Sequence, residues 1–103
     1  MDRMEFLNQI KFECDNDLGC IMSGFFDQYM LLYDLVDTVE NVVVLDTYDN
    51  NGIKFLLTYS NIVSSAKLAE KLSVNPYVII YEKQYGISFS LLNNQVAITI
   101  TRI

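Results

Sequence analysis

The chain has 103 residues, of which 51% are apolar and 19% charged, and its formal net charge is −6. A chain of this length buries enough surface to fold as one compact domain over residues 1–103 without disulfides. The negative charge disfavours direct binding to nucleic acid, and the absence of any apolar run near about 20 residues excludes a helix that crosses a membrane.

The N-terminal residues predict a helix over residues 2–13. Asp2 followed three residues later by Glu5 resembles a capping box, and apolar residues then recur at helical spacing. The same segment lacks the basic start and the apolar stretch of a signal peptide. We therefore expect a cytoplasmic protein, in a bacterial or a host cell, and interpret Cys14 and Cys20 as free thiols.

Helical periodicity continues over residues 21–40, after a predicted loop at residues 15–19. The pattern is clearest over residues 25–40, where it predicts an amphipathic helix with an apolar and an acidic face. The apolar face holds Leu32, Leu35, Val36 and Val39, and the opposite face holds Asp27, Asp34 and Asp37.

The second half of the chain changes from helical to strand periodicity. Strands are predicted at residues 42–48 and 53–59. Asn51 and Gly52 between them are a strong hairpin signal, because tight hairpin turns need positive φ. The two strands are therefore expected to pair with each other in antiparallel fashion.

The last third of the chain predicts one short helix followed by three strands. Ser64 or Ser65 can cap the helix, which should end near Ser73 before Pro76. In the last two strands apolar residues alternate with small or polar ones, which predicts one buried and one solvent-facing side. The strands cover residues 77–83, 86–92 and 95–103, with turns around residues 83–86 and 93–94.

The order of these elements predicts an α+β fold. We expect a five-stranded, mostly antiparallel sheet that is built from a hairpin and a three-stranded meander. Two or three helices should pack on one face of this sheet, because its apolar side needs a cover.

The residue types that carry common catalytic and metal chemistry are sparse. The chain has no histidine, which removes the commonest general base and most zinc sites. Its four glycines are scattered, and neither acidic, turn-like segment matches the ligand spacing of a calcium loop. We therefore expect no catalytic residues, no metal and no cofactor, and we do not expect an enzyme.

Charge is distributed unevenly along the sequence. Residues 1–52 carry eleven acids and two bases, whereas residues 53–103 carry two acids and five bases. Ordinary helix surfaces mix both signs, because opposite charges four residues apart stabilise a helix. We predict a partner-binding face for a basic protein. It is made of the acids between Phe12 and Ile53, a stretch without Lys or Arg: Glu13, Asp15, Asp17, Asp27, Asp34, Asp37, Glu40, Asp46 and Asp49.

Ordinary solvation explains the same carboxylates if the fold scatters them over the surface. They come from a predicted loop, a predicted helix and a predicted hairpin, so they form one face only if the fold brings these elements together. The three-dimensional arrangement decides between the two interpretations.

These patterns favour a small, acidic, non-enzymatic protein-binding domain. We expect an inhibitor or decoy that presents its acidic face to a nuclease or another basic protein that handles nucleic acid. In size and charge, though in no motif, it is similar to inhibitors that bacteriophages encode, anti-CRISPR proteins included. One alternative is a structural or regulatory module that forms a homodimer through its sheet, with the terminal strand pairing if it lies at an edge. Another is an immunity protein that neutralises a toxin through the same acids.

Overall fold

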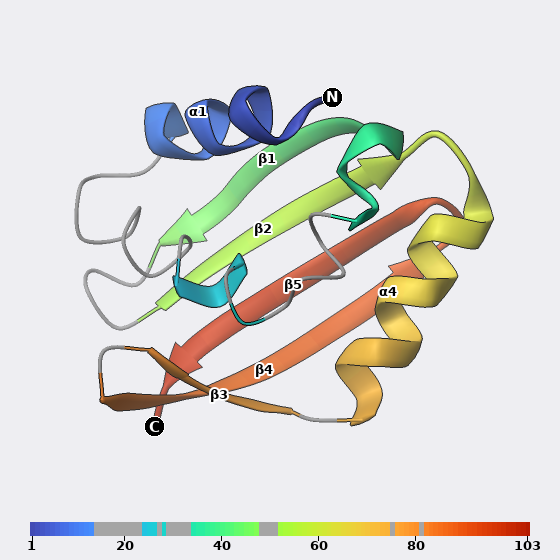
Figure 1. Cartoon of the computed structure of the whole chain (residues 1–103). Helices are drawn as coiled ribbons and strands as arrows, with labels where there is room; N and C mark the ends of the chain where they lie inside the picture. Colours follow the sequence, from blue (N-terminus) through green and yellow to red (C-terminus); the bar gives the residue numbers. More distant parts are fainter. Residues whose placement is uncertain (14–23, 27, 29–33, 48–51, 75, 81) are drawn as a thin grey trace.

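The computed structural model describes residues 1–13, 24–26, 28, 34–47, 52–74, 76–80 and 82–103. Its elements are α1 (Arg3–Glu13), the 3-10 helix η1 (Val36–Thr38), β1 (Val39–Thr47), β2 (Gly52–Tyr59), α4 (Ile62–Val74), β3 (Tyr77–Ile80), β4 (Lys83–Leu92) and β5 (Gln95–Arg102). The strands form one antiparallel sheet in the order β1-β2-β5-β4-β3 (Figure 1). The predicted α+β fold, with its hairpin and its three-stranded meander, is confirmed.

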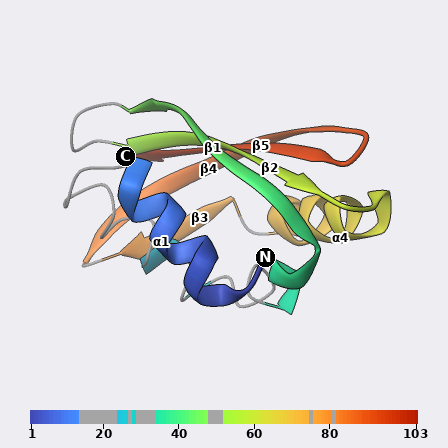
Figure 2. The ribbon, with the colours of Figure 1, turned by 90° about the horizontal axis from the view of Figure 1, so that it is seen from above.

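The described helices lie on one side of the sheet. Seen from above, α1, η1 and α4 lie on the lower side of β2, β4 and β5, where β3 also lies (Figure 2). No described helix covers the opposite side, which we call the open face. The core therefore lies between the sheet and the helices, and its largest fully buried side chains are Tyr59, Phe6, Phe25, Phe26, Phe55, Ile53, Leu57, Leu68 and Leu72.

An aromatic cluster joins the sheet to the N-terminal part of the chain. The ring centroid of Phe55, from β2, lies 6.2 Å from that of Phe25 and 6.0 Å from that of Phe26. Phe26 also packs on Phe6 of α1 at 4.8 Å. Both rings meet that of Phe55 nearly edge-on, an arrangement that aromatic quadrupoles favour. Phe55 therefore holds the segment of Phe25 and Phe26 directly, and α1 is linked to it through Phe26.

The central strands have the predicted period of two. Along β2 and β5, every second residue is buried, and the register pairs Phe55 with Ile98 and Leu57 with Val96. The residues between them face the open side and are only partly buried. This alternation is what a sheet with one covered side requires.

Gly52 has a different role from the one that the sequence suggests. It does not have positive φ; it is the first residue of β2 and pairs with Thr101. A Cβ atom at this position would collide with the backbone carbonyl oxygen of Ile100. The glycine therefore permits a close approach of two backbones. Asn51, the other half of the predicted turn, lies outside the described residues.

The prediction of a continuous helix up to residue 40 is wrong at its C-terminal end. Residues 24–26, 28 and 34 are helical, but Val36–Thr38 form a 3-10 turn and Val39 already belongs to β1. Thr38 closes this turn, because its backbone N and its hydroxyl each donate a hydrogen bond to the Leu35 carbonyl. Two β-branched valines are buried here, a residue type that fits a strand well. Residues 27 and 29–33 lie outside the described part.

Helix α4 begins earlier than expected and has a different cap. Asn61, not a serine, is the N-cap, since its Oδ1 accepts a hydrogen bond from the Ser64 backbone N at 2.8 Å. Ser64 and Ser65 lie inside the helix and are buried. The Ser65 hydroxyl lies 2.8 Å from the carbonyl oxygens of both Ile62 and Asn93, so it ties α4 to the turn after β4.

Replacing Asn61 with alanine should lower the free energy of unfolding by about 1 kcal/mol, because α4 would lose its capping oxygen. Urea denaturation followed by circular dichroism measures this loss. Asn41→Ala is the matched control, since Asn41 is exposed on the open face and its loss should change stability by less than about 0.5 kcal/mol. Equal losses for the two variants would argue against a capping role.

Of the two turns predicted in the meander, one is wrong and one is confirmed. The turn predicted at residues 83–86 is wrong, because β4 starts at Lys83 and the chain reverses at Glu82, which has a φ of 67°. The turn predicted at residues 93–94 is confirmed, and Asn93 has a φ of 54°. Asparagine tolerates this left-handed conformation and therefore signals it in a sequence, whereas glutamate does not.

Strand β5 lies in the centre of the sheet, between β2 and β4. The terminal strand therefore has no free edge for pairing with a second chain. Self-association through this strand required it to lie at an edge of the sheet, and this condition is not met. The edges are β1 and β3. On β1 the side-chain amide of Gln9 donates a hydrogen bond to the Val42 carbonyl at 3.2 Å, and on β3 that of Gln28 donates to the Ile79 carbonyl. Both edges thus have a carbonyl bonded by a glutamine side chain.

Candidate protein-binding surface

The first turn of α1 is fixed by Asp2. Its carboxylate accepts a hydrogen bond from the Glu5 backbone N at 2.8 Å, and its carbonyl accepts one from Phe6 N at 3.0 Å. The bond from the Glu5 amide lowers the pKa of Asp2 below its ordinary value of 3.8. Asp2 therefore caps the helix as a carboxylate, and this stabilisation is lost as the pH falls below that ordinary value.

The N-terminal ammonium group joins α1 to the segment that leads into β1. Met1 N donates hydrogen bonds to the carbonyl oxygens of Asp37 at 3.4 Å and Val39 at 3.2 Å. The hydroxyls of Thr38 and Ser64 lie 2.9 Å apart and share a hydrogen bond, which adds α4 to the same junction. The start of α1 and η1 are therefore held together.

This junction gathers exposed carboxylates at one end of the molecule. We call the set the acidic end; it comprises Asp2, Glu5, Asp34, Asp37 and Glu40, all of which are exposed. Two cations lie in the same segments, the Met1 ammonium and the guanidinium of Arg3. The acidic end therefore keeps a net negative charge that faces solvent.

The predicted partner-binding residues are divided by the fold. Asp34, Asp37 and Glu40 belong to the acidic end, whereas Glu13 is the last residue of α1 and Asp46 lies near the end of β1. Because α1 and β1 run in the same direction (Figure 1), these two lie at the opposite end. Glu40 and Asp46 are six residue steps apart along β1, which corresponds to about 20 Å. Asp15, Asp17, Asp27 and Asp49 lie outside the described residues.

Two members of the acidic end were not among the predicted binding residues. Asp2 and Glu5 appear in the sequence only as a helix cap, more than thirty residues away from Asp37. The hydrogen bonds of Met1 bring them to η1. No local sequence pattern predicts this contact, because it depends on the packing of α1 beside β1.

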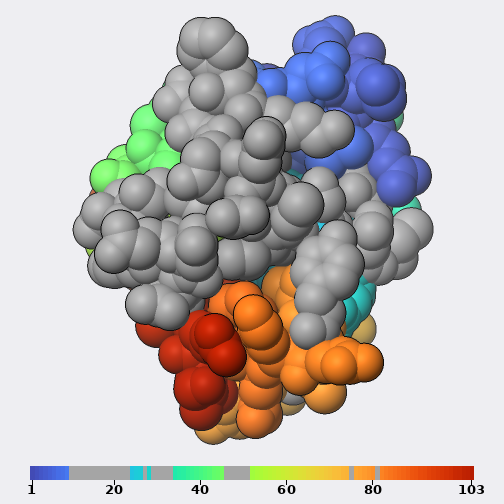
Figure 3. All heavy atoms as spheres, turned by 90° about the vertical axis from the view of Figure 1, so that its left-hand side faces the viewer, coloured from blue at the N-terminus to red at the C-terminus, as the bar shows by residue number. Residues whose placement is uncertain are grey.

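Two basic residues lie at the corner of the fold where β4 starts and β5 ends. Lys83 starts β4 and Arg102 ends β5, and both side chains are exposed. In the space-filling view the segments that carry them, orange and red, lie at the bottom, whereas α1, blue, lies at the top (Figure 3). These two bases therefore lie away from the acidic end, whereas Lys67 and Lys71 lie on α4 and Lys54 lies on β2.

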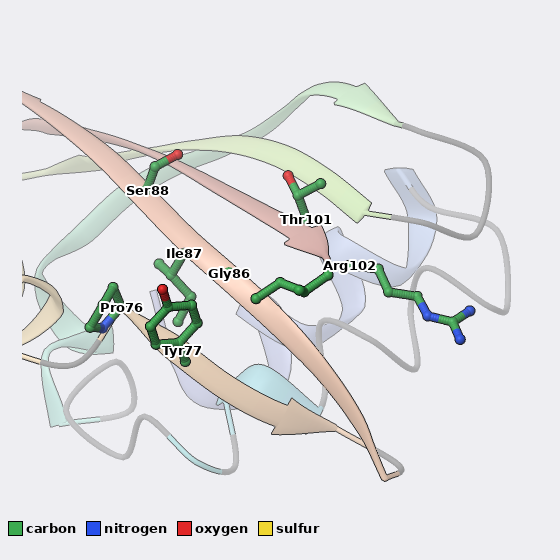
Figure 4. Close-up of a pocket in the computed structure, with 8 residues that line it drawn as sticks. Pro76, Tyr77, Gly86, Ile87, Ser88, Thr101 and Arg102 are labelled. Atoms are coloured by element: carbon green, nitrogen blue, oxygen red, sulfur yellow. The ribbon is translucent and has the colours of Figure 1, made fainter.

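A shallow depression of about 320 Å³ lies beside the C-terminal strand. Pro76, Tyr77, Ser88 and Thr101 line it, and Gly86 forms part of its floor (Figure 4). The Arg102 side chain points away from the other labelled residues (Figure 4). The depression is open and offers hydroxyl groups and an aromatic ring.

Within the described part of the chain, no group of three or more His, Cys, Asp or Glu side chains is placed to hold a metal ion. In the same part, no helix has the length and apolar character that a membrane crossing requires. Comparison with protein-family models, with curated proteins and with solved structures found no match for this chain.

Proposed function

We propose that this chain is a non-catalytic protein-binding domain that docks its acidic end on a basic surface of another protein. The partner class that fits best is a nuclease or another protein with a basic groove for nucleic acid. On this proposal the domain acts as an inhibitor or decoy that occupies the groove in place of DNA or RNA, as phage-encoded inhibitors of anti-CRISPR type do.

The observation that supports this proposal is the packing of α1 against η1. It adds the exposed Asp2 and Glu5 to Asp34, Asp37 and Glu40, so that carboxylates from three segments share one end. Carboxylates that lie at the same end of a domain repel one another, which destabilises the isolated domain. The positive charges of a basic partner offset this repulsion and attract the carboxylates.

An acidic surface of this kind affects both the rate and the selectivity of binding. Charge complementarity raises association rates by a factor of about 10 to 1,000 and discriminates against partners of the wrong sign. The effect weakens with salt, since the Debye length falls to about 8 Å at physiological ionic strength. The acidic end would therefore select basic grooves and repel free nucleic acid.

Charge reversal at Asp37 tests the acidic end directly. Asp37→Lys should weaken binding to a fluorescent decapeptide of Lys and Arg by about tenfold or more, because it replaces an attraction with a repulsion. Fluorescence anisotropy at about 50 and 300 mM NaCl measures affinity and its salt dependence. Asp34→Lys should have the same sign of effect.

Glu70→Lys is the matched control, because Glu70 is exposed on α4 and the change in net charge is identical. It should leave most of the affinity intact. A second measurement follows displacement of labelled DNA from purified nucleases with basic grooves. Equal losses for Asp37→Lys and Glu70→Lys would reduce the effect to net charge and would sink the proposed site.

A further inference from the structure

Strand β3 covers only the first part of β4. The register pairs Tyr77–Ile80 with residues 83–86 of β4, and Ile87 N donates one more hydrogen bond to the Pro76 carbonyl at 2.7 Å. Strand β4 continues to Leu92, and β5 pairs with it on the other side up to that residue. Residues 88–92 therefore form an edge of the sheet beyond the end of β3 (Figure 1), which we call the free edge of β4.

Two residues of the free edge direct their backbone groups outward. Along an antiparallel strand, the N–H and C=O groups of successive residues alternate between its two neighbours. Ile87 N reaches the Pro76 carbonyl on the outer side. Phe89 and Leu91 follow at a spacing of two, so their N–H and C=O groups face the same side. Within the described part of the chain, no backbone group bonds them there.

The free edge lacks the features that usually protect an edge strand. Natural proteins place charges, prolines or bulges on such strands, or they cover them. Residues 84–101 contain no charged residue and no proline, and β4 pairs with β5 without a register shift. Phe89 is half-buried, whereas Leu91 and Leu92 are exposed to 43% and 69%. The free edge is therefore available for pairing with a further strand.

Helix α4 offers support for such a strand. It packs mainly on β4, and it lies on the lower side of the sheet beside the free edge (Figures 1 and 2). Ser65 orients the helix, because its hydroxyl bonds the Asn93 carbonyl just after the end of β4. The stripe of α4 next to Ser65 is uncharged and consists of Ile62, Ala66, Ala69 and Ser73. Side chains of an added strand can rest on this stripe.

We propose that an extended segment of a partner protein adds to the free edge as an antiparallel strand. Antiparallel pairing is the more stable of the two directions. Phe89 and Leu91 then each exchange two hydrogen bonds with the backbone of the partner segment. In this mode of recognition the main-chain bonds supply affinity, and the side chains at alternate positions supply specificity.

The surroundings of the free edge define the sequence pattern of the partner segment. The residues opposite Phe89 and Leu91 point toward α4, where the neighbouring side chains are apolar or small, so apolar residues fit there. The residues between them lie beside Ser88 and Ser90 on the open face and meet water. The segment should therefore alternate apolar residues with polar ones such as Thr.

A second copy of the chain fits this edge less well than a single segment. Antiparallel pairing of two β4 strands places the helical layers of both copies on the same side of the joined sheet. Two α4 helices would then compete for the space beside one edge. Each copy also has a formal net charge of −6, so the two copies repel each other. An extended segment brings no helix and needs no acidic surface.

Fluorescence anisotropy with a designed peptide tests the added strand. The probe is a fluorescein-labelled nonapeptide in which four Thr and three Val residues alternate between two terminal Ser residues. It should bind the whole chain with a dissociation constant between about 10 μM and 1 mM, the range expected of a few main-chain bonds with apolar contacts. Methylation of the three Val backbone nitrogens, which face β4, should weaken binding by about tenfold or more. Methylation of three Thr nitrogens, which face away, is the matched control and should weaken it by less than about threefold.

Leu91→Pro tests the same contact from the side of the protein. Because Leu91 N points outward, proline removes a bond to the peptide and none to β5. The variant should bind the peptide about tenfold more weakly, whereas Leu91→Ala, which keeps the N–H group, should lose less than about threefold. Circular dichroism and the urea midpoint check that both variants fold. If Leu91→Pro does not fold, the two methylated peptides decide with the wild-type chain.

Three results would overturn the proposal. The first is a wild-type chain that does not bind the unmodified peptide below about 1 mM. The second is a loss on methylation of the Thr nitrogens that equals or exceeds the loss on methylation of the Val nitrogens. The third comes from analytical ultracentrifugation: a wild-type dimer that Leu91→Pro converts into a monomer would assign the free edge to a second copy.

The added strand goes beyond the proposed function and is distinguishable from it. Asp37 does not belong to the free edge, so Asp37→Lys should leave binding of the Val and Thr peptide intact while it weakens binding to the basic peptide. Leu91→Pro should have the opposite pattern. Failure of one proposal therefore leaves the other one standing.

Discussion

Phe55→Ala should lower the free energy of unfolding by about 3–5 kcal/mol, the usual cost of removing a buried aromatic side chain. Phe55 has no exposed surface and contacts the rings of Phe25 and Phe26. Its loss removes the contact between β2 and the helical residues before η1. Domains of this size have about 5–15 kcal/mol of stability, so the variant should be close to unfolding. Urea denaturation at neutral pH measures the change.

Phe89→Ala is the matched control, because Phe89 lies on the same side of the sheet but is only partly buried. Its loss should cost clearly less. If Phe55→Ala does not fold, Phe55→Leu keeps the test open, with an expected cost of about 1 kcal/mol. Equal costs for Phe55→Ala and Phe89→Ala would show that the aromatic cluster does not have the central role assigned to it.

Tyr59→Phe should stabilise the protein by about 1 kcal/mol at neutral pH. Tyr59 has no exposed surface, and its hydroxyl has no hydrogen-bond partner among the described residues. A buried hydroxyl without a partner keeps the cost of its lost hydration, which the phenylalanine does not have. The hydrogen bond that the Asn94 side-chain amide donates to the Tyr59 carbonyl is independent of the hydroxyl and should remain.

The same residue gives the protein a loss of stability in alkali. Burial raises the pKa of Tyr59 well above its ordinary value of 10.0. Above that value the unfolded chain loses the phenolic proton while the folded chain keeps it, so stability falls by about 1.4 kcal/mol for each pH unit. The contribution is fully present below the unfolded pKa and is lost as the pH rises toward the folded one.

Urea midpoints at about pH 8, 10 and 11 separate the two effects of Tyr59→Phe. The variant should be more stable than the wild type at every pH and should show a smaller decline above the ordinary pKa of tyrosine. Tyr77→Phe, a change at a half-exposed tyrosine, should leave the decline as it is in the wild type. The same steep decline in Tyr59→Phe and in the wild type would contradict the assignment to Tyr59.

Local patterns in the sequence were sufficient for the class of the fold. Strict alternation at Val96, Ile98 and Ile100 identified a strand with one buried side, and Asn93 identified the turn before it. The strand order needed information of another kind, since the pairing of β2 with β5 joins segments about forty residues apart. Only the packing of the whole sheet decides such a pairing.

The errors have local physical causes. The spacing of Val36 and Val39 fits a helix, but it fits a buried turn followed by a strand equally well. Burial in the tertiary structure favoured the turn and the strand. Asn61 was overlooked as a cap because two serines nearby have the same capping chemistry. Glu82 adopts positive φ without any sequence signal.

The candidate site was only partly predictable. The stretch without Lys or Arg indicated Asp34, Asp37 and Glu40 as binding residues, and the fold does gather these three at one end. Asp2 and Glu5 joined them through long-range hydrogen bonds that no spacing reveals. The open face could not be identified beforehand either, because a residue such as Leu56 has no local feature that tells which side of the sheet stays uncovered.

The central place of β5 also has a consequence for how the chain folds. Within the sheet, the β1–β2 hairpin and the β3–β4 hairpin are joined through residues 95–102. During synthesis both hairpins therefore emerge with unpaired strands until residues 95–102 have left the ribosome. Contacts of such long range slow the search for the native state, so folding in the range of milliseconds to seconds is expected. Until then, the nascent chain exposes the strands that the finished sheet protects.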